Sequence, residues 1–492
     1  MFPEFTLRYA RLPERFHVRF APVPVPEPRL VAFNRPLAEE LGFDLGAFDE
    51  RQAADWFAGN ALPEGADPIA QAYAGHQFGN FVPRLGDGRA VLLGEVRDRN
   101  GGLRDIQLKG AGCTPFSRGA DGRAPLGPVL REYLISEGMH CLGVPSTRAL
   151  AAVTTGERVF RRVPEPGAVL TRVAASHLRV GTFQYFAARG DLEAVRTLAD
   201  MAIERHYPEL AEIDATRRYL ALVEAVQARQ AALVAKWMGL GFIHGVMNTD
   251  NCAIAGETLD YGPCAFMEAY DARTVFSSID EGGRYAYRNQ PWIAQWNLAR
   301  FAETLIPLID DDQERAVERA TEVIKRYEGQ YEAEWLAVMR AKLGLAAEEE
   351  GDRQLAEDLL EALHAGRADF TLSFRRLAEL AGDPQAEAPL LELFERDDPI
   401  RTWLPRWRER LAREGIEMAD IATRMRAVNP LYIPRNHKVE EALAAAVEKD
   451  DFAPFEALRE VLAEPFTEQP GREEYTLPAP PTERVFRTFC GT

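Results

Sequence analysis

Two short segments in the middle of the chain carry residues that suit the binding of a metal–nucleotide complex. Residues 244–251 read His-Gly-Val-Met-Asn-Thr-Asp-Asn, and Asp260 opens an Asp-Tyr-Gly segment nine positions later. Asn251 and Asp260 supply hard amide and carboxylate oxygens, the ligands that Mg²⁺ prefers when it is held against a triphosphate. The two segments therefore predict a site that binds nucleotide together with a divalent metal.

The spacing of these residues matches the catalytic loop of protein kinases, with one rearrangement. In a kinase the loop Asn follows the His by seven positions, as Asn251 follows His244 here. The position of the kinase base aspartate, however, is Val246, which cannot accept a proton, and an aspartate stands instead at Asp250. Asp250 can serve as the base for an acceptor hydroxyl or as a further metal ligand, and the spacing leaves both open. We interpret His244 as a structural loop residue.

Residues nearer the N-terminus can complete such a site. Lys109 ends a strand-like run and Glu132 follows on a predicted helix, the arrangement in which kinases pair a strand lysine with a helix glutamate. Arg172 and Arg179 flank a strand end, and guanidinium groups bind phosphates in a bidentate manner. Glycine-rich loops, whose backbone N–H groups can approach a phosphate closely, supply the other candidates: Gly86, Gly88 and Arg89 in one loop, and Asp121 and Gly122 in another. Each feature alone is common, and the prediction depends on their combination in this order.

The hydrophobic pattern predicts the elements that must position these residues. Strands are expected over 90–96, 105–109 and 168–173, and one helix around residues 128–134 interrupts them. After residue 185 the pattern becomes helical, with one helix capped by Asp191 and a longer one that ends at Gly239. Further helices are predicted over 312–343, 352–365, 384–396 and 437–463, and residues 468–492 are expected to run over the surface.

These elements indicate an α+β protein with a bilobal fold similar to that of protein kinases. A small sheet-plus-helix N-lobe precedes a large helical C-lobe with a C-terminal extension. The predicted division is an N-terminal extension and N-lobe over 1–185, the catalytic core of the C-lobe over 186–300, and a helical extension and tail over 301–492.

Composition limits the partners and the compartment. Lys and Arg total 58 against 76 Asp and Glu, so the net charge is −18, which disfavours nucleic acid and anionic membranes as partners. The chain has no apolar run of transmembrane length and its N-terminus lacks the apolar core of a signal peptide, so we expect a cytoplasmic protein. We also expect the protein to be a monomer. Its five cysteines show no Cys-x-x-Cys spacing, which favours neither a zinc site nor a disulfide framework. Cys490, near the C-terminus, is the cysteine whose expected exposure permits redox chemistry.

Longer strings of residues connect the chain to a known family. They are Tyr-Ala-Gly-His-Gln-Phe-Gly (73–79), Leu-Gly-Asp-Gly-Arg-Ala (85–90), Lys-Gly-Ala-Gly-x-Thr-Pro-Phe-Ser-Arg (109–118), Arg-Glu-Tyr-Leu-Ile-Ser-Glu (131–137), the 244–251 segment, Asp-Tyr-Gly-Pro (260–263) and Asn-Pro-x-Tyr-Ile-Pro-Arg-Asn-His (429–437). Together they resemble the selenoprotein O (YdiU) family over essentially the whole chain.

The resemblance implies a kinase-like protein adenylyltransferase that binds ATP in a reversed orientation. Such an enzyme transfers AMP to Ser, Thr or Tyr hydroxyls of proteins and releases pyrophosphate, with uridylyl transfer as a side activity. It implies Asp250 as the proton acceptor, Lys109 and Glu132 in the catalytic machinery, and Asn251 and Asp260 as ligands of Mg²⁺ or Mn²⁺. It also implies ATP contacts at Gly86, Gly88, Arg89, Lys109, Asp121, Gly122, Arg172, Arg179 and Asp260.

Two other functions fit parts of the same pattern. An ordinary kinase that transfers the γ-phosphoryl group is disfavoured by Val246, and a non-catalytic pseudokinase scaffold is disfavoured by the presence of both Asn251 and Asp260. The resemblance also matches Cys490 to the family's C-terminal Cys or selenocysteine. The second cysteine, which bonds to it in some members, is missing from residues 274–279.

Overall fold

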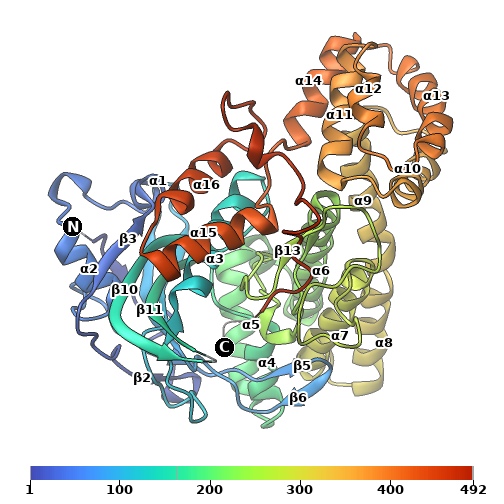
Figure 1. The fold of residues 1–492 in the computed structure, drawn as a ribbon. Coiled ribbons are helices and arrows are strands. Elements are labelled where there is room, and N and C mark those ends of the chain that lie inside the picture. The colour runs from blue at the N-terminus through green and yellow to red at the C-terminus, as the bar shows by residue number, and fades with distance from the viewer. Residues whose placement is uncertain (1, 162, 490–492) are drawn as a thin grey trace.

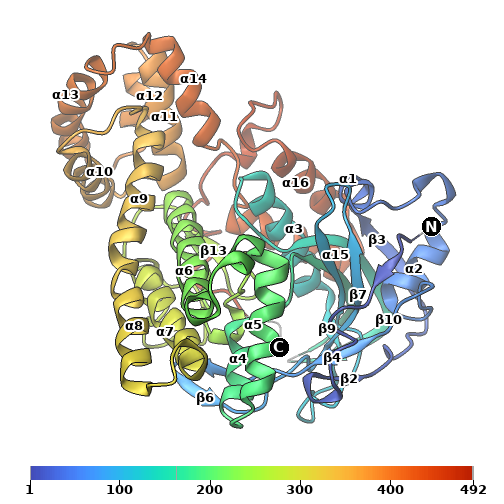
Figure 2. The same ribbon diagram turned by 180° about the vertical axis from the view of Figure 1, so that it is seen from behind.

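The structure, a computed structural model, describes residues 2–161 and 163–489. Within these residues an antiparallel sheet of nine strands forms the N-terminal part, and helices make up most of the rest of the chain (Figures 1 and 2). The order across the sheet is β2 (His17–Arg19), β4 (Ile69–Gln71), β7 (Ala90–Arg97), β8 (Leu103–Lys109), β11 (Pro164–Ala174), β10 (Arg148–Phe160) and β3 (Arg29–Phe33), with β1 (Phe5–Thr6) on β7 and β9 (Ala124–Pro125) on β11. The strands predicted over 90–96, 105–109 and 168–173 are thus confirmed as β7, β8 and β11.

Helices cover both faces of this sheet. On one face α1 (Arg35–Glu40) and α2 (Glu50–Ala58) bury Val91, Leu93 and Ile106. On the other face lies α3 (Leu126–Cys141), which is the helix predicted around residues 128–134, with Pro128 tolerated in its first turn. Two helices from the C-terminal end of the chain, α15 (Asn436–Lys449) and α16 (Ala453–Ala463), pack over α3 (Figure 1, red). The helix that carries Glu132 is therefore held between the sheet and a second layer of helices.

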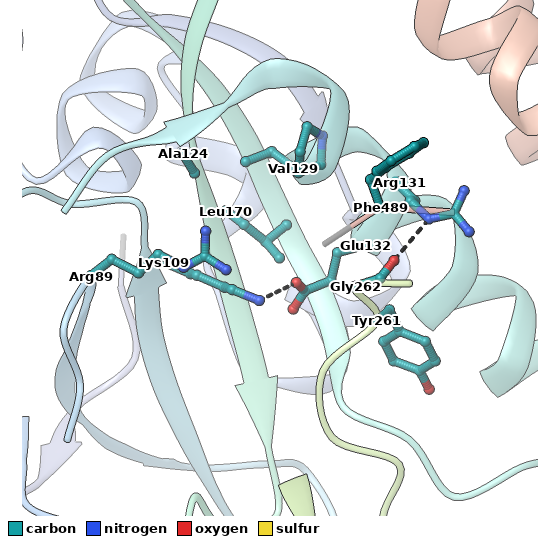
Figure 3. A pocket seen from close by; sticks show the side chains of 11 residues that line it. Arg89, Lys109, Ala124, Val129, Arg131, Glu132, Leu170, Tyr261, Gly262 and Phe489 are labelled. Atoms are coloured by element: carbon teal, nitrogen blue, oxygen red, sulfur yellow. Dashed lines mark hydrogen bonds and ion pairs between the residues drawn. The ribbon is translucent and has the colours of Figure 1, made fainter. Parts of the chain in front are cut away.

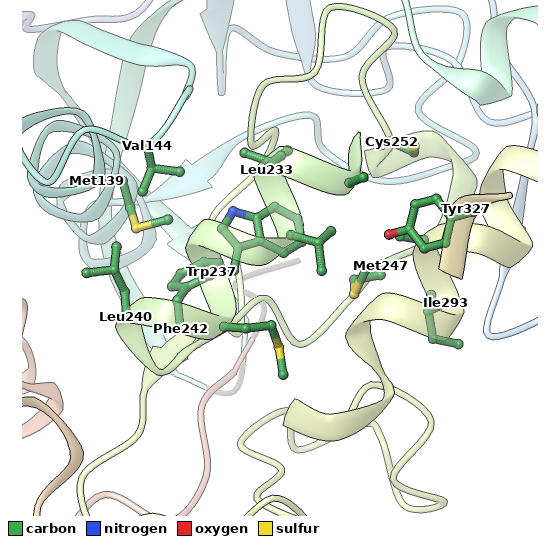
Figure 4. Packing of buried hydrophobic residues seen from close by; sticks show 14 of the residues in the cluster. Met139, Val144, Leu233, Trp237, Leu240, Phe242, Met247, Cys252, Ile293 and Tyr327 are labelled. Carbon is green, nitrogen blue, oxygen red and sulfur yellow. The ribbon is translucent and has the colours of Figure 1, made fainter. Parts of the chain in front are cut away.

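The remaining helices form two groups. The first group consists of α4 (Val180–Ala187), α5 (Leu192–His206), α6 (Ala215–Leu240), α7 (Gln290–Ile309), α8 (Gln313–Lys325) and α9 (Tyr327–Leu343). Further out are α10 (Asp352–Gly366), α11 (Phe370–Gly382), α12 (Glu387–Leu391), α13 (Asp398–Ala412) and α14 (Met418–Val428) (Figures 1 and 2). Trp237, Phe242, Met247 and Ile293 pack into one apolar core beside the 244–251 segment (Figure 4). This core fixes the loop that carries Asp250 and Asn251.

Several predicted boundaries are wrong for identifiable reasons. The long helix α6 ends at Leu240 rather than at Gly239, because Gly241 adopts the left-handed backbone conformation (φ +68°) that stops it. Gly239 lies inside the helix, where a Cβ atom would come 2.4 Å from Cγ1 of Val338 on α9. Of the helix predicted over 384–396, only α12 is helical. The stretches predicted over 312–343 and 437–463 are each divided into two helices.

Most of residues 468–489 are exposed or half-buried, as the sequence predicted, but the end of this segment is anchored to the middle of the molecule. Thr488 is buried, its N–H donates to Phe276 O at 2.8 Å, and Ser278 N donates to Thr488 O at 2.9 Å. The Thr488 hydroxyl donates to the backbone oxygen of Pro263, the last residue of the Asp-Tyr-Gly-Pro segment, at 2.5 Å. The tail therefore returns to the middle of the molecule. Cys490 lies outside the described residues.

None of the helices in the described part of the chain combines the length and the apolar character needed to cross a bilayer.

Candidate active site

A cavity of about 630 Å³ gathers nearly all the residues that the sequence singles out. Its size falls in the range of small-molecule sites. The predicted residues that line it are Gly86, Gly88, Arg89, Lys109, Asp121, Gly122, Arg172, Arg179, Asp250, Asn251 and Asp260. Glu132 is the exception, since it contacts the end of the Lys109 side chain and lines an adjoining, smaller pocket (Figure 3).

Strand register places the two innermost cations side by side. Leu170 on β11 pairs with Lys109 on β8, and Arg172 pairs with Gln107. The side chains of paired residues on neighbouring strands point to the same side of a sheet, and so do those of residues two positions apart on one strand. Lys109 and Arg172 consequently both project toward α3 and meet Glu132.

These side chains form a closed array of two cations and two carboxylates. Lys109 Nζ lies 2.5 Å from Glu132 Oε2, so the ion pair expected from the sequence is present (Figure 3). Arg172 Nε donates to Glu132 Oε1 at 2.8 Å, and Arg172 Nη2 donates to Asp260 Oδ1 at 3.1 Å. Lys109 also donates to Asp260. The array links the sheet, α3 and the Asp-Tyr-Gly segment.

Both carboxylates of the array are ionised. Burial by itself raises the pKa of Glu132, but Arg172 and Lys109 outweigh it and hold the pKa below its usual value. Burial acts in the same direction on the pKa of Asp260, and Lys109 and Arg172 again reverse it, leaving that pKa well below its usual range. An ionised Asp260 is the form that can ligate a cation.

Asp250 has the opposite environment. Its Oδ1 is buried and accepts no hydrogen bond within the described chain, and Gln77 Nε2 approaches Oδ2 only at 3.5 Å. Burial raises the pKa of Asp250 to about 6, although the Arg179 guanidinium opposes the change. Arg179 itself donates from Nη1 to the backbone O of Asp250 at 3.2 Å, and it stacks 4.4 Å from the Tyr73 ring centroid. Asp250 thus combines a carboxylate at the cavity wall with a raised pKa of about 6, which suits a proton acceptor.

Asn251 and Asp260 fit a hard cation. Asn251 Nδ2 donates to Val246 O at 3.0 Å, which fixes the amide, and both donors to Asp260 meet its Oδ1. No hydrogen bond from the residues that the structure describes reaches Asn251 Oδ1 or Asp260 Oδ2. Asp260 also adopts a left-handed conformation (φ +74°), a strain that such sites often retain. The described residues contain no cluster of three His, Cys, Asp or Glu ligands, so a cation here would take its other ligands from phosphates and water, as Mg²⁺ does.

The glycine loops differ from the sequence prediction in their use of the backbone. Gly88 N donates to Gly86 O at 2.8 Å, so the predicted approach of this N–H group to a phosphate is not available, and Asp87 N donates to Gln71 O at 3.0 Å. The glycines instead allow close packing: a Cβ on Gly86 would lie 2.3 Å from the Phe116 ring. Gly122 (φ +67°) likewise lies against the backbone of the same loop. The loop over residues 110–123 is thereby seated as a cover of the cavity.

Sequence reasoning missed the hairpin of β5 (Gly75–Gln77) and β6 (Asn80–Val82) as part of the site. His76 N donates to Thr249 Oγ1 at 2.6 Å and Phe78 N donates to Asn248 Oδ1 at 3.0 Å, so the hairpin is tied to the Asp250 loop. A Cβ on Gly75 would lie 2.6 Å from Asp250 Oδ1. The conspicuous string at 73–79 could have pointed to this hairpin, but no periodicity in the sequence connects it with the distant loop that carries Asp250.

The cysteines also differ in part from expectation. Cys264 is fully buried, and burial raises the pKa of its thiol to about 12, which makes it unreactive. Cys113, in the loop over the cavity, is exposed.

Comparison with known proteins agrees with this geometry. The family model described as "Protein adenylyltransferase SelO" matches residues 2–463. The chain belongs to the SelO family. Curated relatives named "Protein nucleotidyltransferase YdiU" include one from Rhizobium etli, 61% identical over 99% of this chain and 97% of the relative. Another, from Cereibacter sphaeroides, is 62% identical over 99% of both chains. As a SelO family member the chain is a nucleotidyltransferase, with a nucleotide as its substrate.

Proposed function

We propose that this SelO family protein transfers AMP from ATP to Ser, Thr or Tyr hydroxyls of other proteins and releases pyrophosphate. The acceptor hydroxyl gives its proton to the Asp250 carboxylate while its oxygen attacks the α-phosphorus of ATP. The bond from the α-phosphorus to the bridging oxygen breaks, and pyrophosphate leaves with the electron pair. ATP lies in the cavity with its α-phosphate next to Asp250.

The observation that carries the proposal is the environment of Asp250. Asp250 lines the cavity, the Gln77 amide approaches its Oδ2 only at 3.5 Å, and its pKa of about 6 lets it take up a proton near neutral pH. Val246, at the position of a kinase's base, is an apolar side chain that lines the same cavity. This supports an acceptor hydroxyl at Asp250 and disfavours γ-phosphoryl transfer by the kinase route.

The cations of the cavity fit a triphosphate. Lys109 and Arg172 are held at its inner wall by Glu132, and Arg179 and Arg89 line it as well. Fixed cations stabilise charge that develops on phosphate oxygens without reorganising during the reaction. Asp121, held by Arg161 at 2.8 Å, and Gly122 close the cavity from the covering loop.

Asn251 Oδ1 and Asp260 Oδ2 would hold a Mg²⁺ or Mn²⁺ ion. When bound, such an ion offsets charge on the phosphates. Lys109 and Arg172 keep Asp260 ionised for this role, and the Asn251–Val246 hydrogen bond orients the amide oxygen.

We also propose that the fold is kinase-like and bilobal. The order of strand lysine, helix glutamate, catalytic loop, Asn251 and Asp260 supports it, as does a sheet-and-helix part followed by a helical part. In the same proposal the N-terminal extension and N-lobe span 1–185, the catalytic core of the C-lobe spans 186–300, and the helical extension and tail span 301–492.

Mass spectrometry of an acceptor protein incubated with ATP and Mg²⁺ or Mn²⁺ tests the function. We expect the mass of one AMP on a hydroxyl side chain and one pyrophosphate per modification. The mass of one phosphate with release of ADP would instead indicate a kinase, and an unmodified acceptor would indicate a scaffold.

A further inference from the structure

A surface of exposed and half-buried aromatic and arginine side chains lies beside the cavity, and nucleotide binding does not account for it. We call it the hairpin surface, because the β5–β6 hairpin forms one side of it and α7 the other. It consists of Phe81, Ile279, Arg284, Trp292, Trp296 and Arg300. Ile279 is 56% exposed and Trp292 is 55% exposed, so both side chains are available to a partner.

Ring and cation–π contacts join the hairpin, the Arg284 side chain and α7. The rings of Phe81 and Trp296 lie 5.0 Å and 5.1 Å from the His76 ring of the hairpin's first strand. The Arg284 guanidinium carbon lies 5.0 Å from the Trp296 ring centroid and 5.7 Å from that of Trp292. Contiguous exposed patches rich in Trp and Arg are typical of protein interaction sites.

The hairpin surface leads directly to the proposed base. Gln77 and Phe78 of the hairpin line the cavity, as does Ile279, and Gln77 Nε2 lies 3.5 Å from Asp250 Oδ2. Both ribbon views place the hairpin next to α4 and α7, away from the outer helices α10 to α14 (Figures 1 and 2). A chain segment lying on this surface would therefore reach Asp250 with one of its side chains.

The charge of the surface favours an acidic segment. Arg284 forms no ion pair with a carboxylate among the described residues, and Asp280 uses its oxygens to accept from the backbone N–H groups of Arg284 and Tyr285. Arg300 is paired with the exposed Glu303. In a chain with a net charge of −18, such arginines would offset the repulsion of an acidic partner at this one place.

We propose that the hairpin surface binds the acceptor segment of the protein substrate and selects a hydroxyl residue flanked by acidic side chains. Arg284 would pair with an acidic side chain and Trp292 would cover an apolar one. This inference rests on the proposed function, since it concerns the acceptor of the same reaction.

Two synthetic peptides test it: one serine flanked by glutamates in an otherwise fixed sequence, and the same peptide with lysines in place of the glutamates. Initial rates with α-labelled ATP give kcat/KM for each peptide, and the KM for ATP is measured beside them. For the unaltered protein we expect the glutamate peptide to be preferred by about tenfold or more, the size of one well-placed charge pair.

Variants locate the effect. Arg284→Glu should reverse the preference, Arg284→Gln should abolish most of it, and Trp292→Ala should raise the KM of both peptides. The change should appear in the peptide KM and not in the KM for ATP. Arg424→Glu, the same charge change on an exposed arginine of the outer helix α14, is the matched control and should leave the preference as it is.

Equal rates with both peptides, or a preference that Arg284→Glu leaves unchanged, would overturn the docking proposal while adenylyl transfer still stands. A fall in ATP affinity parallel to that in peptide affinity would also overturn it. Absence of label from both peptides and from every protein of a lysate would instead overturn the proposed function, and the docking proposal with it.

Discussion

Replacing Asp250 with asparagine separates catalysis from binding at the proposed base. The amide has nearly the same shape as the carboxylate but cannot take up a proton at neutral pH. The contact of Arg179 with residue 250 is made through the backbone carbonyl at 3.2 Å and survives the change. The contact from Gln77 is long, at 3.5 Å, and an amide oxygen can still accept it.

The expected effects come from these contacts. Since no strong contact is lost, the Kd for ATP with Mg²⁺ should stay within about threefold, less than about 0.7 kcal/mol. Loss of general-base catalysis should lower the rate by about 10²–10⁴-fold, or about 3–5 kcal/mol in the activation free energy. The rate and the affinity should thus change by very different factors.

Calorimetric titration with a non-hydrolysable ATP analogue and Mg²⁺, beside initial rates of α-label incorporation, measures both quantities on one preparation. Asp358→Asn on α10, the same chemical change in a surface ion pair with Arg406, is the control and should alter neither. If affinity and rate fell in parallel for Asp250→Asn, Asp250 would be a metal ligand and the base assignment would be wrong. A rate close to that of the unaltered protein would refute it as well.

Three further predictions concern other parts of the molecule. Lys109→Ala should lower the rate on the order of 10²-fold or more, because it removes a fixed cation from the inner wall of the cavity, and initial-rate assays check this. Asp260→Ala should abolish turnover and the metal-dependent part of ATP affinity, measured by titrations with and without Mg²⁺; normal metal dependence would show that the cation lies elsewhere. Lys342 is buried, donates to Asn429 Oδ1 at 2.8 Å, and burial lowers its pKa to about 7. Unfolded lysine stays protonated up to about pH 10.4, so unfolding takes up a proton above pH 7 and this residue's contribution to stability rises with pH. Between pH 7 and pH 9 the unaltered protein should therefore gain up to about 3 kcal/mol relative to Lys342→Met in urea unfolding, and a constant difference between the two proteins would contradict the lowered pKa.

The sequence predicted the inner part of the site well because its residues occur in long, ordered motifs. The strands over 90–96, 105–109 and 168–173 have a clear apolar pattern, and they fix where Lys109 and Arg172 point. Once Glu132 was placed on a helix between those strands, its ion pair with Lys109 could be expected. The second partner of Glu132, Arg172, depends on the register between β8 and β11, which the sequence does not encode locally.

The features that the sequence did not predict depend on contacts between distant segments. A glycine at position 239 suggests the end of a helix, but the helix continues through it, and close packing against Val338 is the reason for a glycine there. The helix ends before Gly241, which adopts the left-handed conformation. The tail looks polar and proline-rich, but Thr488 is buried by hydrogen bonds to Phe276 and Pro263. The hairpin at 75–82 acquires its role only by meeting Thr249 and Asn248 in space.

Parallel incubations with α-labelled and γ-labelled ATP test the central claim most directly. The two reactions contain the same acceptor protein and metal and differ only in the position of the label. Adenylyl transfer predicts that protein retains label from the α position and none from the γ position, which leaves in pyrophosphate. Label retained on protein only from the γ position would contradict the account.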